Sequence, residues 1–503
     1  MSASAIPTLG EKLNLLVAYT VNPPERANVK EKTRRTAPLH VVKSLLDKLL
    51  DRPTDGGFAE WLIAKHGDKI RYMPEQREWR IYTGGRLMRD DANAAREYVK
   101  NAAQAIIDLI AREKSEKRQQ AMLRLAHRYD TIDRIDKVLA FAASDERLVL
   151  RVTDCDRDPM LLNCTNGVVD LRDGRLLVHQ PFQYLTKTTG IEYDPNTTAP
   201  LFEAFLKRIM RSHHEVIPFI QRALGYALIG HNREHKFFIL YGVGRNGKST
   251  LVEVIITALG DYAQSSNPET WLRQSGGRGA EPEIARLPGV RMVTAAEITE
   301  GRSLDEARVK SIVAGDRTTT RTLYAKPFDF VPVCKLWIST NHAPQIRGGD
   351  EGMWRRVCLI PFDEIIELDE MDRDLPRKLR EELPGILAWM VRGCLEYQRV
   401  GLDEPEIVRA KTSEYRSDSD VIGQFVDECC ERVEDAREPS SALHHRYMEW
   451  ARDRGDRNVF NANAFGRRLT DRGFGTEKIG GVAWRVGLRL RPRDAGDRWA
   501  ASA

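Results

Sequence analysis

Short apolar runs alternate with helix-like periodic stretches through the middle of the chain. Runs of this kind are typical of strands that are buried on both faces of a sheet. They occupy residues 237–241, 290–297, 335–341 and 357–360. Stretches with apolar residues at helical spacing lie around them, at 201–230, 251–259 and 371–400. This order predicts an α/β core at residues 200–400.

The first part of the chain mixes helical and strand patterns and predicts an α+β domain at 41–199. Its expected helices and strands lie at 55–65, 70–73, 79–82, 92–116, 117–143, 148–150, 167–171 and 175–177. The stretch 194–198, Asp-Pro-Asn-Thr-Thr, indicates a linker. Residues 1–40 have no clear period and carry several lysines and arginines, so we expect a flexible basic arm.

The last hundred residues, 401–503, predict a long helix at 406–433 and then a small domain of two helices and a β hairpin. In the second helix, Phe465 and Leu469 face inward, and Arg467 and Arg468 are expected on the exposed side. The hairpin carries Lys478 and Arg485. Two interpretations remain open: a basic surface that contacts nucleic-acid phosphates, or a packing domain with a solvated basic face.

Composition sets limits on the class of protein. The chain has 503 residues, enough for about three domains. Hydrophobic residues make up 42%, charged residues 30%, and the net charge is +5, which is compatible with nucleic acid without requiring it. No apolar run approaches the roughly 20 residues that span a bilayer, and no signal pattern opens the chain. We therefore expect a cytoplasmic protein without a membrane partner. The seven cysteines form no C-x-x-C pair, so a zinc site is not expected.

The segment 242–250, Gly-Val-Gly-Arg-Asn-Gly-Lys-Ser-Thr, fits the phosphate-loop pattern G-x-x-x-x-G-K-[ST]. An expected strand precedes it and an expected helix follows, which is the setting that this motif requires. Its candidate nucleotide-binding residues are Gly242, Val243, Gly244, Arg245, Asn246, Gly247, Lys248, Ser249 and Thr250. Lys248 can reach the β- and γ-phosphates of ATP, and the Ser249 hydroxyl can hold Mg²⁺. The alternative is a glycine-rich turn that matches by chance.

Four further residues carry candidate chemistry. Glu297 ends the strand at 290–297, where an acid can bind Mg²⁺ or polarise water. Asn341 ends the strand at 335–341, where an amide can orient water or simply cap a turn. Arg355 and Arg356 precede the last strand and fit either a solvated edge or an arginine finger that acts on a neighbour's ATP.

The motifs, taken in this order, resemble superfamily 3 helicases, and most closely the phage and plasmid, poxvirus-type primase–helicases. Besides the segments above, the resemblance is carried by residues 310–316, 321–328, 351–357, 161–171 and 221–228. It implies an AAA+-like phosphate-loop ATPase core with a parallel sheet, preceded by a helicase-associated N-terminal domain. A C-terminal winged-helix domain, which the helix–helix–hairpin pattern also indicates, is seen in relatives.

The resemblance also implies roles. Lys248 and Ser249 form the phosphate-loop pair, Glu297 is the Walker B acid and Asn341 is the first sensor. Arg356 takes the place of the arginine finger, with Arg355 as the substitute. A hairpin over 321–333 projects into the pore of a ring, and Arg321, Tyr324 and Lys326 contact DNA by charge and stacking. Taken without the resemblance, Tyr324 and Lys326 indicate no more than an exposed turn.

This chain departs from the pattern in one place. Ala296 precedes Glu297 where many related ATPases have two acids, which leaves open whether Glu300 shares the metal role. The residues before the helicase-associated region hold few acids and no cysteine, so no priming domain is expected in this chain.

The sequence thus predicts an ATP- and Mg²⁺-dependent replicative helicase of a phage, prophage or plasmid. It would act as a homo-hexameric ring on single-stranded and forked DNA, with a separate primase or polymerase as a possible partner. One alternative is an origin-binding ATPase that uses ATP as an assembly switch. Another is a non-replicative ATPase on the same fold.

Overall fold

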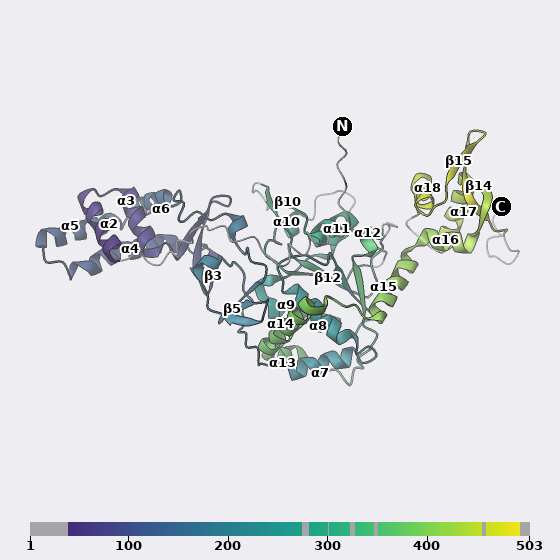
Figure 1. Ribbon diagram of the computed structural model, residues 1–503, viewed down its shortest axis with the longest axis horizontal. Coiled ribbons are helices and arrows are strands. Elements are labelled where there is room, and N and C mark those ends of the chain that lie inside the picture. Colours follow the sequence, from purple (N-terminus) through teal and green to yellow (C-terminus); the bar gives the residue numbers. More distant parts are fainter. Residues whose placement is uncertain are drawn as a thin grey trace, which may run out of the picture. The chain divides into compact units, whose positions relative to one another are not determined.

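A computed structural model describes residues 39–273, 281–299, 301–321, 327–346, 351–454 and 459–492 (Figure 1). The described chain forms two compact units. The first comprises residues up to Ile81 together with Arg89–Leu150, and the second comprises Tyr82–Met88 and the chain from Arg151 onward. None of the helices in the described ranges has the length and apolarity that crossing a membrane requires.

Within the described residues, the first unit packs five helices with the antiparallel strands β1 and β2. Its elements are α2 (Leu39–Asp51), α3 (Asp55–His66), β1 (Ile70–Met73), β2 (Glu78–Thr83), α4 (Ala94–Ile110), α5 (Glu116–Arg128) and α6 (Ile132–Ala142). Strand β3 (Arg86–Arg89), the next strand in the order β1-β2-β3, falls mostly in the segment Tyr82–Met88 of the second unit. The ring of Phe58 stacks on Tyr129 with centroids 3.8 Å apart. The buried indole of Trp61 donates a hydrogen bond to the carbonyl of Ala102 at 2.8 Å. These contacts join α3 to α4 and to the end of α5.

The second unit is built on a five-stranded parallel sheet of order β13-β7-β12-β9-β8. The strands are β7 (Phe237–Tyr241), β8 (Ala263–Ser265), β9 (Met292–Ala296), β12 (Lys335–Thr340) and β13 (Val357–Pro361). The helices around them are α7 (Pro200–Ile209), α8 (Val216–Ala227), α9 (Lys248–Leu259), α10 (Glu281–Ile284), α11 (Glu306–Ala314), α12 (Glu351–Trp354), α13 (Leu375–Glu381) and α14 (Leu383–Val400). The α/β core expected at 200–400 is therefore present.

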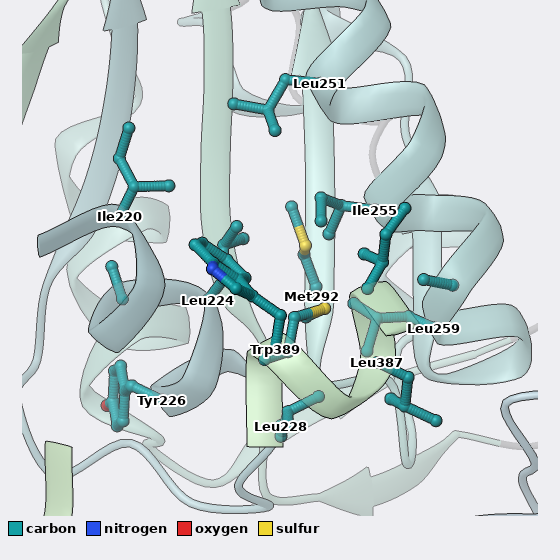
Figure 2. Close-up of a cluster of buried hydrophobic side chains, with 14 of the residues drawn as sticks. Ile220, Leu224, Tyr226, Leu228, Leu251, Ile255, Leu259, Met292, Leu387 and Trp389 are labelled. Carbon is teal, nitrogen blue, oxygen red and sulfur yellow. The ribbon is translucent and has the colours of Figure 1, made fainter. Parts of the chain in front are cut away.

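Alternate residues of each long strand face two different cores, which explains why the strands are apolar throughout. On β7, Phe238 and Leu240 join the core under α8, α9 and α14, whereas Phe237 and Ile239 join the core on the other face. Figure 2 shows the first core, in which Trp389 of α14 lies among side chains of α8, α9 and β9.

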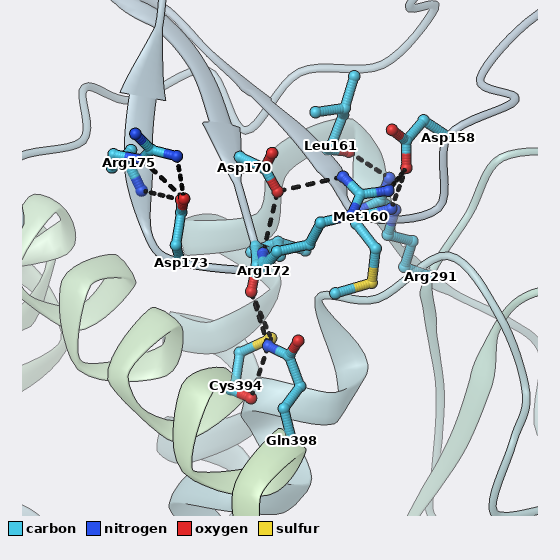
Figure 3. A network of polar contacts seen from close by, with 11 residues as sticks. Asp158, Met160, Leu161, Asp170, Arg172, Asp173, Arg175, Arg291, Cys394 and Gln398 are labelled. Carbon is cyan, nitrogen blue, oxygen red and sulfur yellow. Dashed lines mark hydrogen bonds and ion pairs between the residues drawn. The ribbon is translucent and has the colours of Figure 1, made fainter. Parts of the chain in front are cut away.

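A second small antiparallel sheet, order β4-β5-β6, packs against this core through β4 (Leu161–Cys164), β5 (Gly167–Asp170) and β6 (Arg175–Leu177). The side chain of Gln398 on α14 donates to the carbonyl of Leu171 at 2.6 Å, and Arg291 donates to the carbonyl of Leu161 at 2.6 Å (Figure 3). Residues 151–199, expected in the N-terminal domain, therefore pack with the second unit. The boundary between the units lies at Leu150, because the apolar residues of β4 and β5 share the core of α7, α8 and α14.

Helix α15 (Glu406–Ser419) runs along β13, where the hydroxyl of Thr412 accepts from the amide of Leu359 at 3.0 Å. A separate hydrophobic core then joins three helices to a three-stranded antiparallel sheet of order β14-β16-β15. These elements are α16 (Val421–Cys429), β14 (Cys430–Pro439), α17 (Ser440–Asp453), α18 (Ala462–Asp471), β15 (Thr476–Ile479) and β16 (Val482–Leu490).

Four long helical stretches of the sequence prediction are divided or shorter in the structure. The stretches 92–116 and 117–143 form α4, α5 and α6, and the stretch 201–230 forms α7 and α8. The expected helix at 406–433 breaks at Asp420, whose carboxylate accepts from the amide of Gly423 at 2.9 Å and so begins α16. It also ends early, because residues from Cys430 onward pair with β16.

Candidate functional site

The phosphate-loop segment connects β7 to α9 in the predicted order of strand, loop and helix. At two positions of the loop, steric contacts explain why the residue is glycine. A Cβ at Gly242 would lie 2.2 Å from the carbonyl oxygen of Phe362, so only glycine fits this approach. Gly247 has φ +81°, and a Cβ there would lie 2.5 Å from Ile209 of α7. Arg245 is also left-handed, with φ 63°. Such turns direct successive backbone N–H groups inward, as anion-binding loops do.

Lys248, the first residue of α9, is 4% exposed. Its ammonium donates to the carbonyl of Gly242 at 2.6 Å, to the side-chain oxygen of Asn246 at 2.9 Å and to that of Asn341 at 3.2 Å. All three acceptors are neutral oxygens. Burial lowers the pKa of Lys248 to about 8. An anion bound here would therefore be attracted by an ammonium group that donates to neutral oxygens.

The three predicted polar positions of the nucleotide site meet at one edge of the sheet. β7, β12 and β9 are parallel neighbours, so their carboxyl ends lie together. Asn341 follows β12 and contacts Lys248. Glu297 follows β9, adopts φ 60° and donates its amide to the carbonyl of Ser339 at 3.0 Å. The left-handed turn at Glu297 costs energy for a non-glycine residue and redirects the chain at this edge.

These residues line one cavity of about 810 Å³. Its floor is the phosphate loop from Gly244 to Thr250, with Glu297 and Asn341 beside it. The remaining lining comes from the ends of β9 and β12 and the residues next to them, from α7, and from the segment 366–376 that follows β13. The volume falls within the range of small-molecule sites, about 300–1,000 Å³.

The cavity offers oxygen donors suited to Mg²⁺. The Ser249 hydroxyl and the Glu297 carboxylate both line it and both are exposed to it. Hydroxyl and carboxylate oxygens are ligands that hard cations prefer. The residues therefore fit the metal predicted from the sequence. Glu300, the second candidate acid, lies outside the described residues.

Arg355 and Arg356 lie at the opposite end of the strands, where the amino ends of β7 and β13 meet. They precede β13, and the carbonyl of Arg356 accepts from the amide of Phe237, the first residue of β7. The length of a five-residue strand, about 13–17 Å, separates that point from the phosphate loop. Arg355 is exposed, whereas Arg356 is half-buried and donates to the carbonyl of Gly352. Neither residue lines the cavity of its own chain.

The predicted hairpin is formed by β10 (Thr318–Thr320) and β11 (Phe328–Phe330), which pair antiparallel. Its strands begin three residues before the expected start. Arg321 directly follows β10 and is exposed. Tyr324 and Lys326, the other DNA-contact candidates of this hairpin, lie outside the described residues.

The DNA-contact candidates near the C-terminus differ in how far their side chains are exposed. Arg467 on α18 and Lys478 on β15 are exposed, and Arg468 is half-buried with its guanidinium 3.8 Å from the ring centre of Phe460. Phe465 and Leu469 are buried, as expected.

The prediction that Arg485 contacts DNA is wrong. Its side chain is 6% exposed and donates to the carbonyl of Gly466 at 2.6 Å, to Thr470 Oγ1 at 2.7 Å and to the carbonyl of Phe474 at 3.1 Å. Arg485 therefore joins α18 to the sheet instead of facing solvent.

Several residues that line the cavity outside the phosphate loop were not predicted from the sequence. Leu201, Ala204 and Arg208 lie about forty residues before the phosphate loop, and Ile366 and Leu375 lie more than a hundred after it. On α7 these positions belong to an ordinary amphipathic pattern, so no motif marked them.

Three family descriptions match separate parts of the chain. "D5 N terminal like" matches residues 59–211, "Poxvirus D5 protein-like" matches 417–474, and a family of unknown function matches 240–356.

Among curated proteins, the chain is 28% identical to "Putative helicase L207/L206" of Acanthamoeba polyphaga mimivirus over 319 residues, 59% of this chain and 33% of that protein. It is 26% identical to "Putative helicase 022R" of Frog virus 3 (isolate Goorha), over 46% of this chain and 26% of the relative. It is also 26% identical to "Putative primase C962R" of African swine fever virus (isolate Tick/Malawi/Lil 20-1/1983), over 40% and 22%. The chain thus covers a third or less of each of these relatives.

Among solved structures, two apo forms of the NrS-1 C terminal region are similar in outline. They align over 84% of this chain and 96% of theirs, with TM-scores of 0.44 and 0.47 at 11% and 12% identity. The two D5-type domain matches, together with the viral relatives named as helicases and primases, support a D5-type primase–helicase family for this chain, over the helicase region.

Proposed function

We propose that the chain is an ATP-dependent DNA helicase that acts in the replication of a phage, prophage or plasmid. The observation that carries this proposal is the meeting of Lys248, Asn341 and Glu297 in one cavity at the carboxyl edge of a parallel sheet. The viral relatives named as helicases and primases support a replication role for this region.

ATP would bind with its phosphates on the loop 242–250. The ammonium of Lys248 now donates to three neutral oxygens, and phosphate oxygens would replace some of them as stronger, charged acceptors. Ser249 and Glu297 would hold Mg²⁺, which supplies neutralisation of the charge that develops on the phosphates. The amide of Asn341, already oriented toward Lys248, would contact the γ-phosphate or the attacking water.

Hydrolysis would need a second copy of the chain. Arg355 and Arg356 lie at the sheet edge remote from the phosphate loop, so neither can serve the cavity of its own chain. A neighbouring subunit in a closed ring could bring its cavity to this edge, and six copies are the expected number. Arg355 is the more exposed of the two guanidinium groups.

DNA would meet the ring at two places. Arg321, with Tyr324 and Lys326 beyond it, would contact single-stranded DNA from the hairpin of β10 and β11. The helices and sheet over 421–490 would act as a winged-helix domain, with Arg467 and Lys478 facing the phosphates of duplex DNA.

Unwinding of a forked DNA duplex tests the proposal. We expect the full chain to separate the strands when ATP and Mg²⁺ are present, and the Lys248→Ala variant to lose both unwinding and ATP hydrolysis. Retained unwinding in Lys248→Ala would contradict the assigned site. ATP-dependent binding of duplex DNA without any unwinding would instead favour an origin-binding initiator that uses the same cavity.

A further inference from the structure

Helix α5 of the first unit has one buried side and one exposed basic side. Met122, Leu125 and Ala126 are buried in the core of the unit, where α5 packs on α4 and α2 (Figure 1). Residues at helical spacing on the opposite side are all polar and none is acidic: Lys117, Gln120, Arg124, His127 and Arg128. The three lysine and arginine side chains of this list, Lys117, Arg124 and Arg128, are named the α5 basic surface.

The cations of α5 differ in whether an acid neutralises them. Arg118 lies toward the buried side and pairs with Asp47 of α2 and, at 2.8 Å, with Glu113. This pairing gives Arg118 a structural role, because it joins α5 to α2. The cations of the α5 basic surface are exposed and form no ion pair with any residue that the structure describes.

The charge around this surface is strongly one-sided. Residues 112–128 contain six lysines and arginines and two glutamates. Of these glutamates, Glu113 is paired with Arg118, and Glu116 is the first residue of the helix. An exposed group of like charges of this kind attracts a polyanion.

The length of the surface suits the backbone of duplex DNA. Lys117 and Arg128 are eleven residues apart, which is about 16 Å along a helix. Each strand of B-DNA carries one phosphate per about 3.4 Å of its axis. The α5 basic surface can therefore face several phosphates of one strand at once.

The composition of α5 argues against two other polyanionic partners. Proteins hold single-stranded nucleic acid with aromatic side chains that stack on the bases, and α5 has no Phe, Tyr or Trp. A helix that binds a lipid surface exposes an apolar face. Along α5, which the structure describes in full, Leu123 is the one large apolar side chain that is exposed.

We infer that the α5 basic surface binds the phosphates of double-stranded DNA without reading the base sequence. The contact is additional to those that the proposed function assigns to the hairpin of β10 and β11 and to residues 421–490. It does not depend on the phosphate-loop site, because none of its residues lines that cavity. Binding through phosphates releases counterions and is therefore steeply dependent on salt.

Fluorescence anisotropy with labelled duplex DNA and the full chain, without nucleotide, tests the inference. Lys117→Gln/Arg124→Gln/Arg128→Gln removes three charges at exposed helix positions, where glutamine is well tolerated. We expect duplex binding to weaken at least about tenfold between about 50 and 200 mM salt. The slope of the logarithm of the binding constant against the logarithm of the salt concentration should fall in magnitude by about two to three. The loss should be equal for two duplexes of unrelated sequence.

Arg77→Gln/Lys100→Gln/Lys137→Gln is the matched control. It removes the same charge from exposed positions of the first unit, in the turn between β1 and β2, on α4 and on α6. The control should keep the slope of the unmodified chain, because charges beyond a Debye length of a contact are screened. Arg124→Lys/Arg128→Lys should also keep it, since the number of charges on α5 is unchanged.

An unchanged slope in the triple α5 variant, or an equal loss in the control, would overturn the inference. A loss confined to single-stranded DNA would overturn it as well. Circular dichroism checks folding; if the triple variant is unfolded, Lys117→Gln/Arg124→Gln should still lower the slope by about two. Failure of the ATP site is seen separately, because Lys248→Ala should lose hydrolysis and keep this contact, whereas the triple α5 variant should keep the hydrolysis measured without DNA.

Discussion

At the scale of single residues, the chemistry of the site depends on the burial of Lys248. Its ammonium contacts only neutral oxygens among the partners that the structure describes, and burial lowers its pKa to about 8. Bound phosphates would favour the charged form and raise that pKa again. Nucleotide binding is therefore linked to protonation of this one group.

We expect the affinity for ADP to fall as pH rises above about 8. Between the pKa of the free site and the higher pKa of the occupied site, binding requires uptake of a proton, so the dissociation constant should rise by up to about tenfold per pH unit. Calorimetric titrations from pH 7 to 9.5 measure this change. Lys248→Met is the control, since it removes the titrating group and should bind weakly with a flat profile. A flat profile in the unmodified chain would show that Lys248 does not titrate in this range.

Individual residues also show what sequence patterns can and cannot predict. Glu297 and Asn341 each end an apolar run and Lys248 belongs to a recognisable motif, so each was predicted as a candidate, whereas their shared site was implied by the resemblance to superfamily 3 helicases. The α7 residues that line the cavity could not be predicted, because their positions belong to an ordinary amphipathic helix pattern. The burial of Arg485 was missed because its three acceptors belong to α18 and the turn after it, not to its own strand.

At the scale of elements, α18 and the sheet beside it separate basic residues with a structural role from those free to contact DNA. Arg485→Ala should lower the free energy of unfolding by about 2–3 kcal/mol, because buried acceptors lose a charged donor. Arg467→Ala should change stability by less than about 0.5 kcal/mol. It should instead weaken duplex binding. The slope of the logarithm of the binding constant against the logarithm of the salt concentration should fall in magnitude by about one.

Chemical denaturation and salt-dependent DNA-binding titrations of both variants check this division. A weaker salt dependence in a stable, folded Arg485→Ala protein, with none in Arg467→Ala, would reverse the roles given to the two arginines.

Some helices and strands were predicted more accurately than others. The strands of the parallel sheet were found because they are buried on both faces and contain few polar residues. Helix ends were missed where a cap interrupts an otherwise continuous pattern, as at Asp420. The strand order β13-β7-β12-β9-β8 could not be predicted, because it depends on pairings between residues as far apart in the sequence as Phe237 and Val357.

At the scale of the whole molecule, the proposed role of Arg355 and Arg356 makes hydrolysis a property of an assembly. An arginine supplied by a neighbour is worth about three to five orders of magnitude in phosphate-transfer rate. The double variant Arg355→Ala/Arg356→Ala should therefore bind nucleotide normally but lose hydrolysis.

Mixing that double variant with Lys248→Ala tests whether the arginines act between subunits. Each variant alone should be inactive, and the mixture should recover hydrolysis, because some interfaces would combine an intact phosphate loop with intact arginines. No recovery in mixed assemblies, once exchange of subunits is demonstrated, would place the arginines outside the active site.

Coupling of nucleotide hydrolysis in this cavity to DNA can be measured as the rate of ATP hydrolysis by the full chain with and without single-stranded DNA. We expect the rate to rise when single-stranded DNA is added and to disappear in Lys248→Ala. An equal rate with and without DNA would show that hydrolysis is not coupled to DNA.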